Sequence, residues 1–427
     1  MDKASLEQWL QRLEHLHPNA IELGLERVAS VAARLDLLPV AIPVVTVAGT
    51  NGKGSTVAVL EAVLGRAGKR AGVYTSPHLL RFNERIRVAA VEVTDEEIVA
   101  AFESIEAARG TTSLTYFEFA TLAALQVFHA RAVDVMILEV GLGGRLDAVN
   151  IVDPTVAVIT RIDLDHQAWL GDSRASIARE KAGILRSGQP AVIGDRDPPA
   201  ELLAYAEQLG ASPVLRLGRD FDAIAVSSGR WRGMIGDRAL PELNRGSLLP
   251  DNICSALQAA ALLGYQLSDA ELVEVLAGAG VSGRCELHKE GGREFILDVA
   301  HNPAAVNNLV EYLAITPCKG KVIALFSVMS DKDLGGMIAA AATHFDAWFV
   351  ADQPANARAA TAAELADTLH RAGQAAVSVS KNLRQAWRRA QEIMTEGDRL
   401  VVFGSFYTVA EILPLLAREQ SRVGQET

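Results

Sequence analysis

The sequence predicts an α/β protein of two domains, each built on a parallel-rich sheet flanked by helices. The chain has 427 residues, and a single hydrophobic core stops growing at roughly 250 to 300 residues. Short apolar runs typical of buried strands alternate with segments rich in Ala, Leu and Glu that are typical of helices, and this alternation occurs in two series. We therefore expect two sheets and two cores.

The first series begins at residue 43. Buried strands are predicted by its apolar runs, which lie at residues 44–47, 72–74, 133–140 and 156–162. Residues 55–67 and 115–131 lie between these runs and carry the apolar spacing of helices. Strands that alternate with helices favour a parallel sheet wrapped by those helices.

The second series begins near residue 294. Strands are predicted at residues 294–299, 322–327, 347–351 and 400–403, and helices after residue 303, through residue 337, at 360–372, at 383–394 and at the end of the chain. This pattern indicates a second, Rossmann-like unit. We place a hinge at residues 281–293 and the domains at residues 1–288 and 289–427, so that facing strand ends would frame a cleft.

Composition and charge exclude several classes of protein. Hydrophobic residues make up 49% of the chain and charged residues 22%, which indicates a globular protein. No apolar run reaches the roughly 18 residues of a membrane span, and the first residues lack the pattern of a signal peptide. A formal charge of −11 disfavours nucleic acid or an anionic membrane as a partner. We expect a cytoplasmic monomer whose cysteines, Cys254, Cys285 and Cys318, are reduced and mostly buried.

A glycine-rich loop at residues 48–56 follows the first predicted strand. It carries Lys53 and then Ser55 and Thr56 at the start of a helix, which together supply backbone donors, a cation and a hydroxyl group for a triphosphate. The loop departs from the usual pattern because Val47 replaces the first glycine and Gly54 is inserted after the lysine. The alternative is a strand-to-helix turn without a ligand.

Polar residues at the ends of other predicted strands point to the same site. Glu139 ends an apolar run, and a buried carboxylate needs either a bound metal ion such as Mg²⁺ or a salt bridge, to Arg145 or another cation. His166 follows the next strand, although a lone histidine is usually a packing residue. Lys181 lies in a helical segment, where most lysines are solvated.

Several motifs in this order together resemble one family. They are the phosphate loop, Thr75-Ser76-Pro77-His78, the run 138–147, Asp165-His166, Glu180-Lys181-Ala182-Gly183 and Asp298-Val299-Ala300-His301-Asn302-Pro303. With Leu23-Gly24-Leu25-Glu26-Arg27 near the start, they resemble the folylpolyglutamate synthases, often with dihydrofolate synthase activity, of the Mur ligase superfamily. The resemblance implies a central domain with the phosphate loop and a smaller Rossmann-like C-terminal domain.

The resemblance also implies a site for ATP and two Mg²⁺ ions. The nucleotide would be bound by Thr50, Asn51, Gly52, Lys53, Gly54, Ser55, Asn252, Arg284 and Asp298. The metal ions would be bound by Ser55, Ser76, Glu139 and His166. The catalytic residues would be Lys53, His166, Lys181 and His301. Lys181 would be carbamylated, which converts an amine that repels Mg²⁺ into a carboxylate-like oxygen donor.

For the organic substrates, the family pattern implies two further sets of residues. The pterin-bearing substrate would be bound by residues of the segment from Leu23 to Arg27, namely Leu23, Gly24, Leu25, Glu26 and Arg27, and by Thr115, Tyr116, Phe117, Glu118, Leu146, Asp147 and Ala148. Phe117 would stack on the flat ring, and Glu118 or Asp147 would hydrogen-bond it. Glutamate would be bound by His301 and Ser405. The alternatives are helix core for Phe117, a cap for Asp147 and a helix N-cap for Ser405.

The expected reaction is ATP-dependent amide formation. A substrate carboxylate would take the γ-phosphate of ATP, and the amino group of L-glutamate would attack the resulting acyl phosphate. The substrates would be dihydropteroate, which gives dihydrofolate, and reduced folates, which are extended through the γ-carboxyl. The nearest alternative is an enzyme that only extends glutamate chains. A P-loop ATPase of another class is more distant.

Overall fold

The computed structural model describes residues 4–19 and 21–423, and the chain forms two compact units, Met1–Ala279 and Gly280–Thr427. The expected division after residue 288 needs correction, because it would cut strand β13 (Glu286–Glu290), which pairs along its whole length with β14 (Arg293–Asp298). The same hairpin occupies the second half of the expected hinge at residues 281–293. No helix among the described residues has the length and apolar character needed to cross a membrane.

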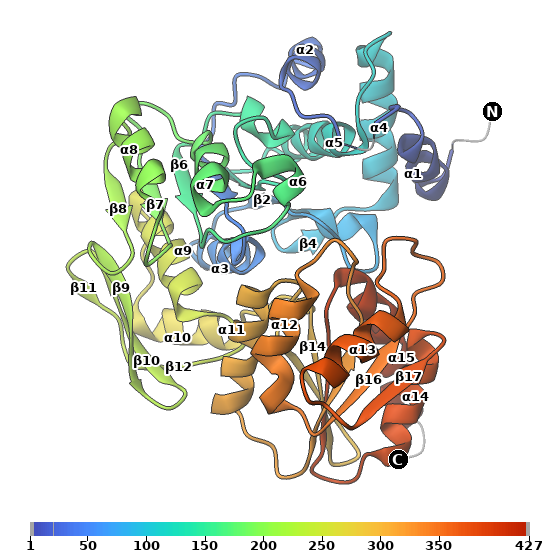
Figure 1. Cartoon of the computed structure of the whole chain (residues 1–427). Helices are drawn as coiled ribbons and strands as arrows, with labels where there is room; N and C mark the ends of the chain where they lie inside the picture. The colour runs from blue at the N-terminus through green and yellow to red at the C-terminus, as the bar shows by residue number, and fades with distance from the viewer. Residues whose placement is uncertain (1–3, 20, 424–427) are drawn as a thin grey trace. The chain divides into compact units, whose positions relative to one another are not determined.

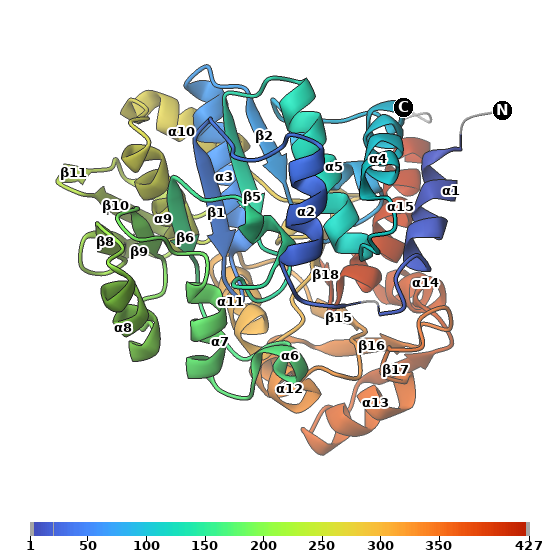
Figure 2. The same cartoon turned by 90° about the horizontal axis from the view of Figure 1, so that it is seen from above.

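The first unit is centred on an eight-stranded sheet in the order β4-β3-β2-β5-β1-β6-β7-β8. Its strands are β1 (Val44–Ala48), β2 (Ala71–Tyr74), β3 (Ile86–Val88), β4 (Val91–Glu92), β5 (Val135–Glu139), β6 (Val156–Ile159), β7 (Ala191–Ile193) and β8 (Val214–Arg216). Figure 2 shows β2, β5, β1 and β6 side by side. The strands from β2 to β8 in this order pair in parallel, and β3 and β4 add an antiparallel edge. The predicted parallel sheet is therefore confirmed.

Helices cover this sheet. They are α1 (Leu6–Glu14), α2 (Glu26–Arg34), α3 (Lys53–Arg66), η1 (Phe82–Arg85), α4 (Asp95–Arg109), α5 (Tyr116–Ala130), η2 (Ala148–Ile151), α6 (Gln167–Leu170), α7 (Arg174–Ala182), α8 (Ala200–Leu209), α9 (Pro250–Leu262) and α10 (Asp269–Gly278). Helix α5 begins at a capping box, in which the Thr115 side chain and the Glu118 side chain each accept a backbone N–H from the other residue. This cap fixes the start of the helix that carries Phe117.

A small antiparallel sheet follows the eight-stranded sheet along the chain. It contains β9 (Phe221–Ser227), β10 (Arg230–Ile235), β11 (Arg238–Ala239) and β12 (Leu243–Asn244). One face of β10 is buried through Trp231 and Ile235, whereas Arg230, Arg232 and Met234 face outward. This sheet packs on α9, which in turn packs on α3, so it supports the helix of the phosphate loop from behind.

The second unit contains a six-stranded sheet in the order β13-β14-β18-β15-β16-β17. Its remaining elements are α11 (Pro303–Ile315), β15 (Val322–Phe326), α12 (Leu334–Ala341), η3 (Ala342–His344), β16 (Ala347–Ala351), α13 (Ala362–Arg371), β17 (Val377–Ser380), α14 (Leu383–Ile393), β18 (Arg399–Phe403) and α15 (Phe406–Val423). All neighbours pair in parallel except β13 and β14. Figure 1 shows α13 and α14 beside this sheet. The predicted Rossmann-like unit is confirmed.

The cysteines agree with the sequence analysis. All three are free thiols, and Cys254 and Cys285 are buried while Cys318 is partly exposed. Burial raises the pKa of the Cys254 thiol.

Candidate active site

The phosphate loop leaves β1 at Ala48 and passes so close to neighbouring segments that two positions require glycine. A Cβ atom on Gly49 would lie 1.8 Å from Thr160 Oγ1, and one on Gly52 would lie 2.4 Å from Asn252 Oδ1. Gly52 also has a φ of +96°, a conformation that residues with a Cβ rarely adopt. The loop is therefore held against the end of β6 and the start of α9, and Asn252 lies directly beside it.

Hydrogen bonds fix the first half of the loop to the segment after β6. The Thr50 N–H donates to the Arg161 carbonyl (2.8 Å), and the Thr50 hydroxyl donates to the Asp163 carbonyl (3.0 Å). The N–H groups of Thr50 and Asn51 are thus already used within the protein. The donors best placed for an anion are those of the first turn of α3, at Lys53, Gly54 and Ser55, because a helix leaves its first N–H groups without intrahelical partners.

Two lysines converge on this loop from different elements. The Nζ atoms of Lys53 and Lys181 both donate to the carbonyl oxygen of Gly49, at 3.0 and 2.9 Å. Lys181 is buried, so the expectation that it is an ordinary solvated helix lysine is wrong. Burial, and then the positive charge of Lys53, lower the pKa of Lys181 to about 7. This lysine is therefore partly neutral near neutral pH.

The glycine-rich run after β5 positions the helix that carries Lys181. The Arg145 N–H donates to the Glu180 carbonyl (2.8 Å), and a Cβ on Gly144 would lie 2.8 Å from the same oxygen. Gly183 is equally constrained by the side chain of Arg145. These close approaches attach α7 to the loop after β5 and bring Lys181 to the phosphate loop.

Glu139 ends β5 at the same edge of the sheet. Its Cα is paired with that of Val47, next to the phosphate loop, and its carboxylate accepts the Ser76 N–H (3.3 Å). Arg145, which the alternative salt bridge would use, pairs with Glu180 of α7 at 2.9 Å. The structure therefore places a buried carboxylate, the Ser76 segment and the phosphate loop together.

The donor set suits a hard divalent cation only in part. Glu139, Ser76 and Ser55 offer oxygen atoms, which Mg²⁺ prefers. Over residues 4–19 and 21–423, no three His, Cys, Asp or Glu side chains form a metal-binding group, so hydroxyl groups or ligand phosphates would have to complete the coordination. His166 is exposed at the start of α6, with a φ of +52°.

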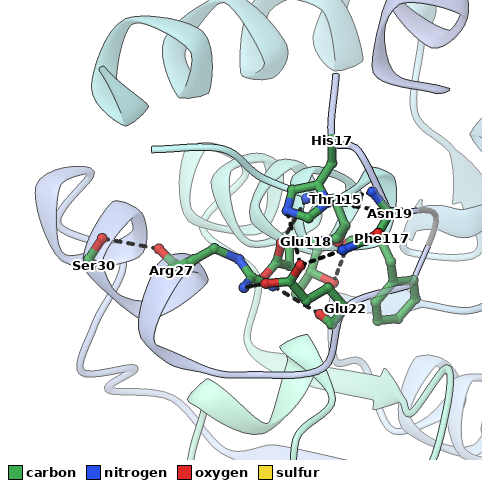
Figure 3. A network of polar contacts seen from close by, with 9 residues as sticks. His17, Asn19, Glu22, Arg27, Ser30, Thr115, Phe117 and Glu118 are labelled. Atoms are coloured by element: carbon green, nitrogen blue, oxygen red, sulfur yellow. Dashed lines mark hydrogen bonds and ion pairs between the residues drawn. The ribbon is translucent and has the colours of Figure 1, made fainter. Parts of the chain in front are cut away.

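The segments expected to hold the pterin are joined by direct contacts, and Figure 3 shows part of this arrangement. The Gly24 N–H donates to the Leu146 carbonyl (3.3 Å), and Arg27 forms an ion pair with Glu118 (3.1 Å). The half-buried ring of Phe117 lies 5.9 Å from that of Tyr74. Three stretches that are far apart in the sequence therefore meet at one place in the first unit.

Asp147 acts as a cap, as its alternative interpretation stated. Its two carboxylate oxygens accept the N–H groups of Leu142 (2.8 Å) and Val149 (3.0 Å), so it closes the loop after β5 and begins η2. Burial raises the pKa of Asp147 to about 6, and Lys53 acts in the opposite direction. Capping does not remove Asp147 from the substrate proposal, since Phe117 lies beside the same loop at Gly141.

In the second unit, the expected residues lie at the carboxyl ends of β14 and β18. Asp298 is buried and accepts the N–H groups of Cys285 (2.8 Å) and Ala300 (2.7 Å). Burial raises the pKa of Asp298, while Arg284 opposes the shift. The guanidinium of Arg284 and the ring of His301 lie 5.6 and 6.1 Å from the ring of Phe406. Arg284, Asp298 and His301 thus share one end of this sheet.

Ser405 is a helix N-cap, as its alternative interpretation stated. Its hydroxyl accepts the Thr408 N–H (3.0 Å) in the first turn of α15. Thr408 donates in turn to the Ser327 carbonyl (2.7 Å), and Gln353 donates to both the Ser327 and Thr408 hydroxyls. A buried polar network therefore holds Ser405 at the end of β18.

Sequence reasoning missed two residues that shape the site. Thr160 donates its hydroxyl to the Asn51 carbonyl (2.8 Å) and sets how closely Gly49 can approach. The backbone carbonyl of Arg161 accepts hydrogen bonds from the loop. A backbone contact of this kind cannot be recognised from a pattern of side chains. The one available signal was a threonine at the end of an otherwise apolar strand.

Comparison with known proteins supports the resemblance to the folylpolyglutamate synthases of the Mur ligase superfamily. The Mur ligase middle domain matches residues 47–230, and the Mur ligase glutamate ligase domain matches residues 283–406. The chain is 42% identical to the dihydrofolate synthase/folylpolyglutamate synthase of Escherichia coli K12, over 97% of this chain and 96% of that protein.

Solved structures agree. The structure of E. coli FolC in complex with DHPP and ADP has a TM-score of 0.92 and 41% identity, and covers 98% of this chain and 99% of that chain. A bifunctional folylpolyglutamate synthase/dihydrofolate synthase with Mn, AMPPNP and L-glutamate bound has a TM-score of 0.89 and 45% identity, and covers 97% of this chain and 98% of that chain. The chain belongs to the dihydrofolate synthase/folylpolyglutamate synthase family of Mur ligases.

Proposed function

We propose that this chain is an ATP-dependent ligase that adds L-glutamate to dihydropteroate, forming dihydrofolate, and to the γ-carboxyl of reduced folates. The observation that carries this proposal is the convergence of Lys53 and Lys181 on the Gly49 carbonyl, at the N-terminus of α3. The charge of Lys53 and the backbone donors of the helix start are concentrated there, where the phosphates of ATP would bind.

The first step transfers a phosphoryl group. A carboxylate oxygen of the pterin-bearing substrate attacks the γ-phosphorus of ATP, and the bond to ADP breaks, which gives an acyl phosphate. Lys53 and the N–H groups at the start of α3 stabilise the negative charge that develops on the phosphoryl oxygens. A bound Mg²⁺, held by Glu139, Ser76 and Ser55, would add positive charge beside the phosphates.

The second step forms the amide. The amino group of glutamate attacks the acyl carbon, phosphate leaves with the bonding electrons, and the nitrogen loses a proton. In the second unit, Ser405 and His301 are the residues we propose for glutamate, and Arg284 and Asp298 are those for the nucleotide. Asp298, His301 and Ser405 lie at the carboxyl ends of two parallel strands, which supports this assignment, since ligands of such sheets bind at that edge. Arg284 precedes β13 at the same end of the sheet.

We propose that Lys181 is carbamylated in the active protein. Its neutral amine attacks CO₂, and loss of one proton leaves a carbamate. A pKa of about 7 supports this step, because a large share of the amine is neutral at physiological pH. The remaining N–H can still donate to the Gly49 carbonyl, while the new carboxylate group supplies oxygen donors close to Lys53.

The pterin-bearing substrate would lie where Leu23–Leu25, Thr115–Glu118 and Leu146–Ala148 meet. Phe117 provides a flat apolar surface for the ring. We further propose that the protein works as a monomer in the cytoplasm on small molecules alone, without nucleic acid or membrane, and light scattering that gave the mass of a dimer would contradict the monomer.

A steady-state assay of phosphate release tests the proposal, with ATP, the pterin substrate or glutamate omitted in turn. A ligase releases phosphate at its full rate only when all three are present. A P-loop ATPase of another class would hydrolyse ATP without an amine acceptor. Comparing dihydropteroate with tetrahydrofolate as the acceptor separates the bifunctional enzyme from one that only extends glutamate chains.

A further inference from the structure

We propose that Arg27 is a positioning residue for the pterin-bearing substrate, which it controls by clamping the N-terminal segment onto the start of α5. This inference rests on the proposed function and gives Arg27 and Glu118, which lie in segments already expected at the substrate site, a joint role in shaping it. The pair acts through the segments it joins, and neither residue needs to touch the substrate.

Arg27 forms the clamp by hydrogen-bonding Glu118 of α5 on the one hand and Glu22 of the N-terminal segment on the other. Nη2 donates to Oε1 of Glu118 (3.1 Å) and to the Glu22 carbonyl (2.9 Å), and Nη1 donates to the Glu22 carboxylate. Figure 3 shows the Arg27 guanidinium beside Glu22 and Glu118. The Glu118 side chain is only 4% exposed, and a carboxylate so deeply buried requires a cation or strong donors.

Both oxygens of Glu118 are already engaged. Oε1 accepts from Arg27, and Oε2 accepts the Thr115 N–H (2.7 Å) in the capping box of α5. Glu118 therefore joins the cap of α5 to Arg27, and its neighbour Phe117 is carried on the same first turn. This changes the role expected for Glu118, from a hydrogen bond to the pterin ring to support for the helix that presents Phe117.

The segment before Arg27 depends on side-chain contacts because it lacks regular structure. Between α1 and α2 the described residues form neither helix nor strand, and the Gly24 N–H reaches the Leu146 carbonyl at 3.3 Å. The carboxylate of Glu22 also accepts from Asn19 (2.9 Å) and lies 3.7 Å from Nε2 of His17. Glu22 thus contacts other residues of its own segment, and Arg27 joins Glu22 to the buried carboxylate of Glu118 in α5.

Arg27 should therefore affect the affinity for the pterin-bearing substrate. With Arg27 in place, the segment that contains Leu23 and Leu25 is held to Glu118, the neighbour of Phe117, before the substrate arrives, so little ordering remains to be done on binding. Without it, the segment is released and a buried carboxylate loses its cation, so binding must restore the order. The affinity for the pterin substrate should fall while the phosphate loop, held by Thr160 and Arg161, keeps its affinity for ATP.

The test compares the KM for dihydropteroate with the KM for ATP in variants of the full-length enzyme. Arg27→Ala should raise the KM for dihydropteroate on the order of tenfold or more, as expected when a distant substitution misplaces a substrate, and leave the KM for ATP within about twofold. Arg27→Lys should restore only part of the loss, because one ammonium group cannot bond Glu22 and Glu118 in the fork geometry of arginine. Glu118→Gln should mimic Arg27→Ala, and the double variant should be no worse than either single variant.

Arg131→Ala is the matched control. Arg131 caps the other end of α5 and pairs with Glu97 (2.5 Å) on α4, far along the helix from Phe117, so both KM values should stay unchanged. The proposal is overturned if Arg27→Ala leaves the KM for dihydropteroate unchanged, or if it raises both KM values in parallel, which would mean that the pair only stabilises the unit. Failure of the wild-type enzyme to require the pterin substrate would instead overturn the proposed function.

Discussion

Lys53 is the residue on which the phosphate chemistry depends most directly. It lies in the first turn of α3, donates to the Gly49 carbonyl and is only partly buried. Lys53→Ala should therefore leave the melting temperature close to that of the wild type and lower phosphate release on the order of a hundredfold to a thousandfold. Lys69→Ala, just beyond the end of the same helix, is the control, and near-normal turnover in Lys53→Ala would refute the phosphate-loop assignment.

Lys181 has a pH dependence whose direction is set by its environment. Because its pKa is about 7 instead of 10.5, the amine loses its proton between about pH 6 and pH 8. Only the neutral amine reacts with CO₂, so carbamate content and activity should rise together over this interval at a fixed CO₂ concentration. Carbon-13 NMR with labelled bicarbonate measures the carbamate directly.

The matched variant for this prediction is Lys181→Ala. It should lack the carbamate signal and lose most of its activity at every pH. A carbamate signal that persists in Lys181→Ala, or wild-type rates in this variant, would return Lys181 to a packing role.

Single residues also show where sequence reasoning reaches its limit. Motifs singled out Lys53, Glu139 and Lys181, and each lies at or near an element end that the pattern of strands and helices defines. The pattern could not show that Lys181 is buried or that Glu118 is paired with Arg27 over 91 positions, because these facts depend on packing between distant segments.

At the scale of elements, the turn from β1 to α3 depends on the absence of a side chain at Gly49. Gly49→Ala should destabilise the protein by about 1 to 3 kcal/mol, the usual cost of overpacking, and it should also reduce activity, since the loop must move away from Thr160. Gly65→Ala is the control within α3, where no atom lies within 4 Å of the added carbon. It should stabilise the helix by roughly 0.5 to 1 kcal/mol. Thermal unfolding and phosphate release measure both effects, and unchanged values for Gly49→Ala would contradict this account of the loop.

Elements with continuous apolar runs could be predicted, and short exposed strands could not. The strands β1, β5, β6, β15 and β18 are almost entirely buried and are largely apolar in sequence, with Thr46, Glu139 and Arg399 as their polar residues. The sheet of β9 to β12 was missed, because β10 alternates exposed and buried residues over only six positions and β11 and β12 have two residues each. Gly229, between β9 and β10, was the available turn signal.

At the scale of the whole molecule, the two-domain organisation could be predicted from chain length and from the two series of strands and helices. The boundary between the two domains was predicted less accurately. Strand β13 is a polar edge strand, and its sequence cannot be distinguished from that of a linker. Its pairing with β14 assigns it to the second unit. The order of strands within each sheet also lies beyond the reach of local patterns, because it depends on long-range pairing.

Phosphate release with each substrate omitted in turn tests most directly whether the whole enzyme is a ligase. We expect full turnover only when ATP, glutamate and a pterin acid are all present, with either dihydropteroate or tetrahydrofolate accepted. Sustained phosphate release from ATP in the absence of glutamate and of the pterin acid would contradict it.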